Sequence, residues 1–341
     1  MTDGKRWKIG FAVVTLVALL AAAGGGAAYL RRQLAPADLQ GEDQPFIIER
    51  GTGLGRVARQ LESQGLIRSA RVFIALARYR DQAGAIHAGE YLVAPSLTTQ
   101  EVLEQLVKGR VRHYEVIIPE GLRSTEIAAR LEAAEILRAE DFLAAIADPA
   151  LAKDLGVPAN HLEGYLFPDT YNLPSGVSAE DVARVMVGQF QRVWGELGAA
   201  LPTRDPELNL HDLVTLASIV EKETGAADER PVIASVFLNR LRRNMRLETD
   251  PTVIFGIPDF DGNLRRVHLE DRTNPYNTYR IRGLPPGPIA SPGAAALRSV
   301  IEPATSEYLF FVARGDGTHE FSVRYADHNR AVDRYQRRRR R

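Results

Sequence analysis

Residues Asn209–Thr224 have the sequence NLHDLVTLASIVEKET, which predicts a core helix that ends in charged side chains. Asn209 is a favourable N-cap residue, and Asp212 stands where an acidic side chain completes a capping box. Apolar residues then recur three or four positions apart, as on one face of a helix: Leu213, Leu216, Ala217 and Val220. We therefore expect a helix that buries one stripe and carries its charged end to the edge of a core.

Two glutamates lie at the end of this predicted helix. Glu221 follows Ala217 by four positions, so we expect it at the edge of the buried stripe. Glu223 is about 200° further around the helix axis, so we expect it to face solvent. Partial desolvation favours the protonated form of a carboxyl group, which can donate a proton to a leaving glycosidic oxygen. Glu221 is therefore a candidate general acid, and the alternative is a surface side chain paired with Arg230 or Lys222.

The composition is that of an ordinary globular protein with more than one folded unit. The 341 residues exceed the usual size of one domain, and the 43 basic residues balance the 43 acidic ones, so charge gives no reason to expect nucleic acid binding. The chain has no cysteine, which excludes disulfides, thiolate nucleophiles and a cysteine-linked lipid anchor. The histidines show no metal-ligand spacing. We expect no metal and no cofactor.

The N-terminal region predicts a membrane anchor. Residues 9–30 carry no charge and, as a helix, would extend about 33 Å, enough to cross a hydrocarbon core. Basic residues flank this stretch on both sides: Lys5, Arg6 and Lys8 before it, Arg31 and Arg32 after it. We expect residues 1–8 in the cytoplasm, a single span over residues 9–30, a linker over residues 31–45, and the rest of the chain outside the cytoplasm. The alternative is a cleaved signal peptide.

An internal repeat follows the linker. Residues 46–51 align with residues 116–121 at an offset of 70, and matched apolar positions continue through Val72 and Phe142. Each copy predicts a strand, a turn at glycine and two helices. With a second strand near residues 87–93, residues 46–112 resemble a LysM module, a type of domain that binds N-acetylglucosamine polymers. The alternative is a packing subdomain without sugar affinity.

The remaining sequence predicts three further parts. Residues 113–158 hold the second copy of the repeat and end in a boundary rich in proline and glycine. Residues 159–335 are rich in Gly-Pro turns and polar-aromatic clusters, which indicates an irregular α+β catalytic domain. Residues 336–341 form a basic tail, which is either a solvated terminus or a segment attracted to an anionic polymer or membrane. The predicted fold class is α+β.

Several separated motifs closely resemble those of the endolytic murein transglycosylases of the YceG-like (MltG) family. They are EGYLFPDTY at Glu163–Tyr171, LASIVEKET at Leu216–Thr224, LNRL at Leu238–Leu241, MRLETDPTVI at Met245–Ile254, YNTY at Tyr276–Tyr279 and GLPPGPIASPG at Gly283–Gly293. They occur in the order of that family, and the resemblance covers nearly the whole chain, including the anchor and the LysM-like region. The resemblance implies that the first glutamate of Val-Glu-Lys-Glu-Thr, Glu221, is the catalytic acid/base.

The resemblance also implies a reaction and a location. In a lytic transglycosylase, the C6 hydroxyl of N-acetylmuramic acid attacks its own anomeric carbon, so a second catalytic carboxylate is not needed. The product has a 1,6-anhydro-N-acetylmuramic acid end, and cleavage would terminate strand elongation. The expected substrate is nascent peptidoglycan, the expected location is the periplasmic side of the bacterial inner membrane, and the expected partners are peptidoglycan synthases (penicillin-binding proteins).

Other polar residues of these motifs are candidates for substrate binding. If Tyr276–Tyr279 forms a strand, Asn277 and Tyr279 share one face, where they would orient the acetamido group and the scissile sugar, while Tyr276 points to the other face. The remaining candidates are Asn239, Arg240, Asp250 and Glu163. Arg240 would pair with Glu221 or with a carboxylate of the substrate. The structural alternatives are a buried aromatic pair for the Tyr276–Tyr279 motif, a helix-surface charge for Arg240 and a cap for Asp250.

Two other functions remain open at this point. In the first, the protein is a muramidase-type hydrolase in which Asp250 or Glu163 activates water. In the second, it is a membrane-anchored scaffold that binds glycan without cutting it. The two reactions differ in product mass, because an anhydro end is one water lighter than a reducing end.

Overall fold

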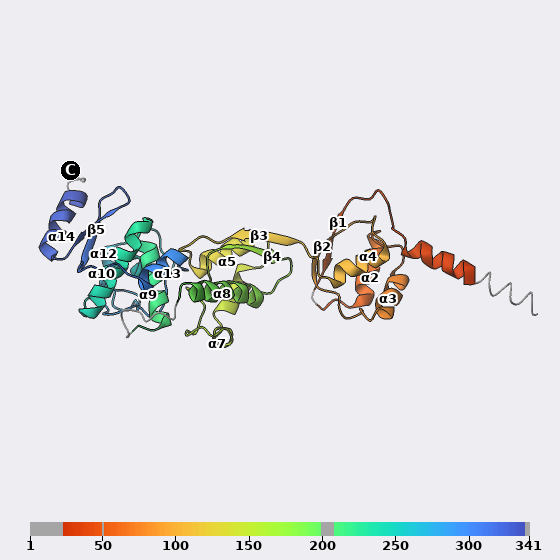
Figure 1. The fold of residues 1–341 in the computed structure, drawn as a ribbon, viewed down its shortest axis with the longest axis horizontal. Helices are drawn as coiled ribbons and strands as arrows, with labels where there is room; N and C mark the ends of the chain where they lie inside the picture. Colours follow the sequence, from red (N-terminus) through yellow and green to blue (C-terminus); the bar gives the residue numbers. More distant parts are fainter. Residues whose placement is uncertain (1–22, 50, 199–207, 338–341) are drawn as a thin grey trace, which may run out of the picture. The chain divides into compact units, whose positions relative to one another are not determined.

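The computed structural model describes residues 23–49, 51–198 and 208–337, which form two compact units (Figure 1). The first unit holds the described residues up to Tyr114 together with Pro174–Gly176, and the second holds Glu115–Leu173 and the chain from Val177 onward. Most of the predicted membrane anchor lies outside the described residues. Within the described ranges, no helix has both the length and the hydrophobicity that a membrane crossing requires.

The first unit packs three helices on a two-stranded antiparallel sheet. Its elements, after a helix at residues 23–34, are β1 (Gln44–Ile48), α2 (Leu54–Ser63), α3 (Ala70–Tyr79), β2 (Gly89–Val93) and α4 (Thr99–Val107). Phe46 of β1 lies opposite Tyr91 of β2, and both side chains are fully buried. The predicted strand, helix, helix, strand order is therefore present, whereas sugar binding by this unit stays a prediction.

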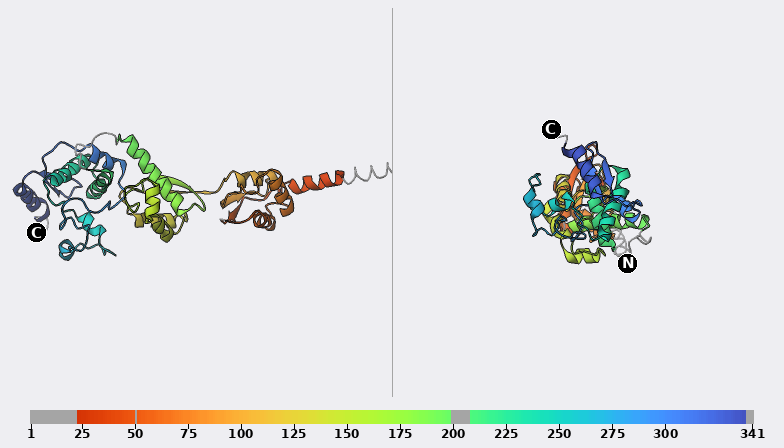
Figure 2. Two further views of the ribbon diagram at one scale, coloured as in Figure 1. Left: turned by 90° about the horizontal axis from the view of Figure 1, so that it is seen from below. Right: turned by 90° about the vertical axis from the view of Figure 1, so that its left-hand side faces the viewer.

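The second copy of the repeat opens the second unit. Its elements are β3 (His113–Ile117), α5 (Ser124–Ala133), α6 (Ala139–Ile146), α7 (Pro149–Asp154), β4 (Thr170–Pro174) and the long green helix α8 (Ala179–Glu196) in Figures 1 and 2. The first two residues of β3 and the last residue of β4 belong to the first unit. β3 pairs with β4. Gly51 and Gly121, the turn residues of the two copies, both have positive φ angles, of 78° and 76°, which glycine adopts without steric cost. The turns predicted from the repeat are confirmed.

The rest of the second unit is built around α9 (Leu210–Glu223), which packs against α10 (Arg230–Arg242) and α13 (Ala294–Ile301). The shorter elements are η1 (Ala227–Glu229), α11 (Asp250–Phe255), α12 (Arg266–Glu270), β5 (Phe310–Ala313), β6 (His319–Ser322), α14 (Tyr325–Val332) and η2 (Asp333–Arg337). β5 and β6 form an antiparallel hairpin. The predicted mixed α+β architecture is confirmed.

Helix α9 begins as predicted but is buried more completely than predicted. Asn209 and Asp212 form the capping box, with N–H to side-chain oxygen distances of 3.0 and 3.1 Å. Every residue from Leu213 to Val220 is buried, so the helix has no solvent-facing side along these residues. The apolar stripe identified the helix, but surrounding loops and helices cover its other faces as well. Consequently, helical periodicity alone does not say which end residue meets solvent.

Candidate functional site

The two glutamates at the end of α9 lie in different surroundings. Glu221 occupies a small cluster of charged side chains, with only 6% of its side chain exposed. Its Oε1 lies 3.3 Å from Nη2 of Arg230, and its Oε2 accepts a hydrogen bond of 3.0 Å from the N–H of Gly293. The structural alternative in which Glu221 pairs with Arg230 is therefore present.

A second carboxylate completes the cluster around Arg230. Oε2 of Glu120 lies 3.9 Å from Nη2 of Arg230, and the Glu120 carboxylate covers Gly293 so closely that a Cβ there would overlap with it. Partial burial raises the pKa of Glu120, and the negative charge of Glu221 raises it further. We call Glu120, Glu221 and Arg230 the Arg230 cluster. One guanidinium thus neutralises two acidic side chains from distant parts of the chain.

Hydrogen bonds to backbone carbonyls join the same region to the end of α9. Nζ of Lys222 donates to the carbonyl of Gly121 at 3.0 Å, and the N–H of Gly121 donates to the carbonyl of Ser291 at 2.9 Å. The N–H of Ser291 donates in turn to the carbonyl of Leu122 at 2.8 Å. The Arg230 cluster therefore lies where the turn of the second repeat, the Gly283–Gly293 motif and α9 meet.

Glu223 lines a cavity of about 560 Å³, which we call the Glu223 cavity. The prediction that Glu223 faces solvent is wrong, because the segment before α11 and the β5–β6 hairpin cover this side of the helix end. Burial raises the pKa of Glu223, and the charge of Asp250 adds to this, while a hydrogen bond from the Thr249 hydroxyl opposes it. The structure thus holds a carboxyl group whose neutral form is favoured, next to a space that a ligand can enter.

Three of the predicted substrate-binding residues also line the Glu223 cavity: Arg240, Asp250 and Tyr279. The Tyr279 hydroxyl donates a hydrogen bond of 2.8 Å to Oδ1 of Asp250, and burial raises the pKa of Tyr279. Arg240 donates hydrogen bonds to the carbonyls of Leu309 and Leu247 at 2.7 and 2.9 Å, so it mainly connects α10 to the backbone segments of the cavity wall. Its predicted pairing with Glu221 is not present, because Arg230 takes that place.

The Tyr276–Tyr279 motif is a turn, and the predicted strand is wrong. Asn277 is fully buried, and its amide nitrogen donates to the carbonyls of His268, Leu269 and Asp271, at 3.1, 3.3 and 2.6 Å. Because these bonds occupy the Asn277 amide, the side chain organises the turn. It is not among the residues that line the Glu223 cavity. The turn presents Tyr279 to the cavity, while Tyr276 packs on Phe255 with 4.7 Å between ring centroids.

The two remaining predicted residues have structural partners outside the cavity. Nδ2 of Asn239 donates to the carbonyls of Ser306 and Tyr308 at 2.9 and 3.0 Å, which fastens α10 to the segment before β5. Glu163 is buried and accepts hydrogen bonds from the backbone and hydroxyl of Ser124. Burial raises the pKa of Glu163. Neither residue lines the Glu223 cavity.

Sequence reasoning gave Glu229 no role, although it lies at this site together with His319. His319 begins β6 and lines the Glu223 cavity, and Glu229 holds its ring and its backbone N–H. A separation of 90 residues hides this pair from any local pattern. Across the residues that the structure describes, no three His, Asp or Glu side chains gather as metal ligands would.

Comparison with known proteins identifies the family. Residues 46–334 match the YceG-like family. The chain is 28% identical over 330 residues to the endolytic murein transglycosylase of Bacillus subtilis, covering 92% of this chain and 90% of that protein. It is 30% identical over 361 residues to the endolytic murein transglycosylase of Streptococcus pneumoniae (strain D39), covering 96% of this chain and 65% of that protein.

A solved structure supports the same assignment. The crystal structure of a YceG-like protein from Listeria monocytogenes superposes with a TM-score of 0.59 and 31% sequence identity, covering 86% of this chain and 100% of that one. The matched family region extends over most of both units and includes every predicted site residue. The chain belongs to the YceG-like family.

Proposed function

We propose that this protein is an endolytic murein transglycosylase that uses Glu223 as its general acid. The relatives from B. subtilis and S. pneumoniae carry that activity in their names. The observation that carries the proposal is a half-buried glutamate with a raised pKa on the wall of a 560 Å³ cavity. A raised pKa favours the protonated form of the carboxyl group, which can deliver its proton to a leaving oxygen.

The choice of Glu223 over Glu221 rests on their surroundings. Glu221 is paired with Arg230 and is not among the residues that line the Glu223 cavity. Its carboxylate is instead engaged by Arg230 at 3.3 Å and by the N–H of Gly293 at 3.0 Å. The assignment of Glu221 drawn from the family resemblance therefore becomes the competing hypothesis, and the two differ by two positions in one motif.

The proposed reaction needs one acid and an internal nucleophile. Glu223 protonates the oxygen that links C1 of N-acetylmuramic acid to the next sugar, and the C1–O bond breaks. The C6 oxygen of the same residue then bonds to C1 and its proton passes to a basic group of the cavity, which leaves a 1,6-anhydro end. An attached, well-oriented nucleophile replaces water, with an effective concentration on the order of 10⁵ M or more.

Membrane anchoring would set where this reaction takes place. The uncharged stretch at residues 9–30 supports a single span, with the catalytic unit on the periplasmic side. A tether of this kind confines the enzyme to nascent glycan near the membrane, where cleavage would terminate strand elongation beside penicillin-binding proteins. The first unit, with its LysM-like order of elements, would hold the strand.

One competing reaction remains because Asp250 lies in the same cavity. A hydrolase would use Asp250 to activate water. The Tyr279 hydroxyl, 2.8 Å from Oδ1 of Asp250, would orient the Asp250 carboxylate. Glu163, the other carboxylate considered for this role, does not line the Glu223 cavity. Asp250 is therefore the remaining candidate for the base in the hydrolase hypothesis.

The test is mass analysis of purified glycan strands after digestion by the full-length protein in detergent. The proposal predicts internal cleavage with new ends one water lighter than reducing ends. Reducing ends would establish the hydrolase, and intact strands in the presence of folded protein would contradict both enzymatic hypotheses.

A further inference from the structure

A histidine with a fixed orientation lies on the wall of the Glu223 cavity. The backbone N–H of His319 donates to Oε1 of Glu229 at 2.8 Å, and Nδ1 of the ring lies 2.7 Å from Oε2. A ring nitrogen this close to a carboxylate carries the hydrogen, so Nε2 is the nitrogen that can accept a proton. Glu229 thus fixes both the tautomer and the direction of the ring.

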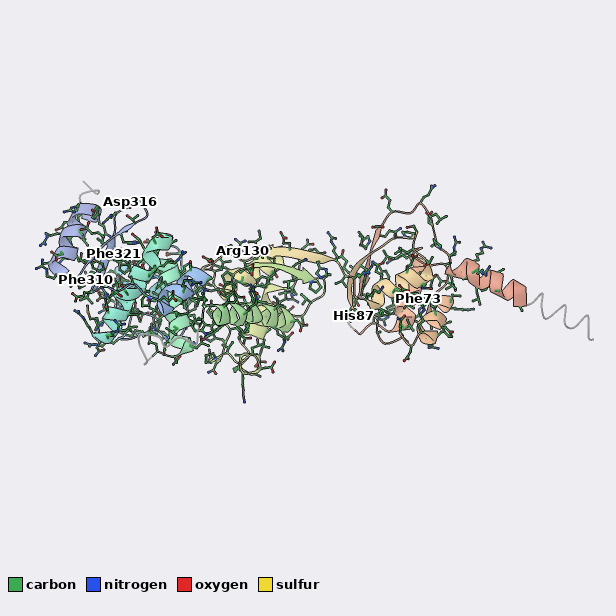
Figure 3. All side chains as sticks on the ribbon, in the orientation of Figure 1. Phe73, His87, Arg130, Phe310, Asp316 and Phe321 are labelled. Carbon is green, nitrogen blue, oxygen red and sulfur yellow. The ribbon has the colours of Figure 1, made fainter. Side chains whose placement is uncertain are left out.

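The protein around His319 keeps the ring in this position. Only 11% of the His319 side chain and 15% of the Glu229 side chain are exposed. The ring meets Phe311 edge-on at a centroid distance of 5.4 Å, and Phe321 lies at 6.4 Å. Phe321, labelled in Figure 3, belongs to the same hairpin. A buried carboxylate and two aromatic rings therefore restrict an imidazole that borders a polar cavity.

The titratable and charged groups that share this space come from several elements. They are Glu223 of α9, Glu229 of η1, Arg240 of α10, Glu248 and Asp250 at the start of α11, Tyr279 of the turn, and Tyr325 and His328 of α14. The interaction of His319 with Glu223 lowers the pKa of Glu223 against the larger effect of burial. A proton on His319 therefore favours the deprotonated form of Glu223.

We propose that His319, oriented by Glu229, is a second catalytic residue of the cavity and accepts the proton of the attacking C6 hydroxyl. This proposal rests on the proposed function. The proton of Glu223 goes to the leaving oxygen as the C1–O bond breaks, and the C6 oxygen bonds to C1. The proton of the C6 hydroxyl goes to Nε2 of His319. The resulting imidazolium is stabilised by Glu229 and returns its proton to Glu223 through solvent, so one turnover consumes no proton.

The first test uses His319→Gln in the full-length protein with purified glycan strands. The proposal predicts that kcat falls on the order of 10²-fold or more with KM nearly unchanged, because only the proton transfer is lost. The pH profile of kcat should also differ from that of wild type. His113→Gln is the matched control, since His113 is exposed on β3 and its Nδ1 lies 2.9 Å from the backbone carbonyl oxygen of Val111.

The second test separates chemistry from packing. His319→Ala leaves space beside Phe311 that free imidazole can enter, so added imidazole should restore cleavage in proportion to its unprotonated fraction. Glu229→Gln should lower kcat less than His319→Gln does and should shift the pH profile, because Glu229 is a positioning residue. This rescue test decides the matter even where a variant is less stable than wild type.

The outcomes are distinct from those of the proposed function. His319→Gln that cleaves within about threefold of wild type with the same pH profile, while Glu223→Gln is inactive, would overturn the role of His319 alone. Loss of stability in His319→Gln and His319→Ala without imidazole rescue would also overturn it, in favour of a packing role. A wild-type protein that makes no anhydro ends would instead contradict the proposed function.

Discussion

Glu229 and Arg230 are adjacent in the chain, yet they hold residues of two different sites. Glu229 binds His319 on the wall of the Glu223 cavity, and Arg230 binds Glu221 at 3.3 Å. The junction of η1 and α10 therefore supplies a charged side chain both to the surroundings of Glu221 and to those of Glu223 at the end of α9. This arrangement assigns Glu221 a structural charge pair and leaves Glu223 facing the cavity.

The Arg230 cluster is expected to contribute to stability. Glu221→Gln should lower the free energy of unfolding by about 1–3 kcal/mol, because Arg230 loses its nearest charged partner in a largely buried place. Urea unfolding followed by the fluorescence of Trp194, which lies in α8 of the second unit, measures the loss. Glu120→Gln is the control and should cost less, since 48% of its side chain is exposed. Equal stability of Glu221→Gln and wild type would refute the structural role.

The raised pKa of Glu223 has a consequence for stability as the pH changes. The native state holds the Glu223 proton more tightly than the unfolded chain does, whose carboxyl has a pKa near 4.5. The protonated Glu223 carboxyl group therefore stabilises the native state at low pH. This contribution is lost as the pH rises from about 4.5 through the raised pKa of Glu223 in the native state. Glu223→Gln should remove this loss, so the variant should gain stability relative to wild type with rising pH. Parallel urea curves from pH 4 to pH 8, with a constant difference between the two proteins, would contradict the prediction.

Asn277 is expected to matter for folding more than for catalysis. Asn277→Ala leaves three carbonyls without their donor and should lower the free energy of unfolding by about 2–3 kcal/mol. Below the temperature at which it unfolds, the variant should retain kcat within about tenfold of wild type, since the Asn277 amide has no face toward the cavity. The measurement pairs thermal unfolding with glycan cleavage at low temperature. A stable variant with abolished cleavage would restore the substrate-binding role that the sequence predicts.

Asp250 allows the two enzymatic hypotheses to be separated by a single substitution. Asp250→Asn retains a hydrogen-bond acceptor for the Tyr279 hydroxyl but cannot act as a base. Under the lytic mechanism, the variant should still produce anhydro ends, with a rate within about tenfold of wild type. Tyr279→Phe serves as the control for loss of the hydrogen bond itself. Abolished cleavage in Asp250→Asn alone would favour the hydrolase.

Local patterns in the sequence predicted the parts of the fold that depend on neighbouring residues. Asn209 and Asp212 predicted the start of α9, and the repeat predicted the turns at Gly51 and Gly121. These features are set by backbone conformation and by contacts within a few positions. They needed no knowledge of distant segments.

The features that were missed depend on segments far apart in the chain. Periodicity placed Glu223 toward solvent, but Thr249 and Asp250, more than 20 residues later, cover that side of the helix end. The Tyr276–Tyr279 motif alternates like a strand, yet the buried amide of Asn277 closes it into a turn. Motif matching alone could not decide which of Glu221 and Glu223 meets a ligand, because that depends on the loops packed around the helix end.

The most direct measurement compares wild type, Glu223→Gln and Glu221→Gln on the same purified glycan strands, with the folded fraction of each protein determined by Trp194 fluorescence. Wild type should release anhydro ends, and Glu223→Gln should lose this activity by a factor on the order of 10³ while remaining folded. Glu221→Gln, corrected for its folded fraction, should retain most of it. Cleavage by Glu223→Gln at the wild-type rate, or a fully folded Glu221→Gln without activity, would contradict the assignment of Glu223 as the acid.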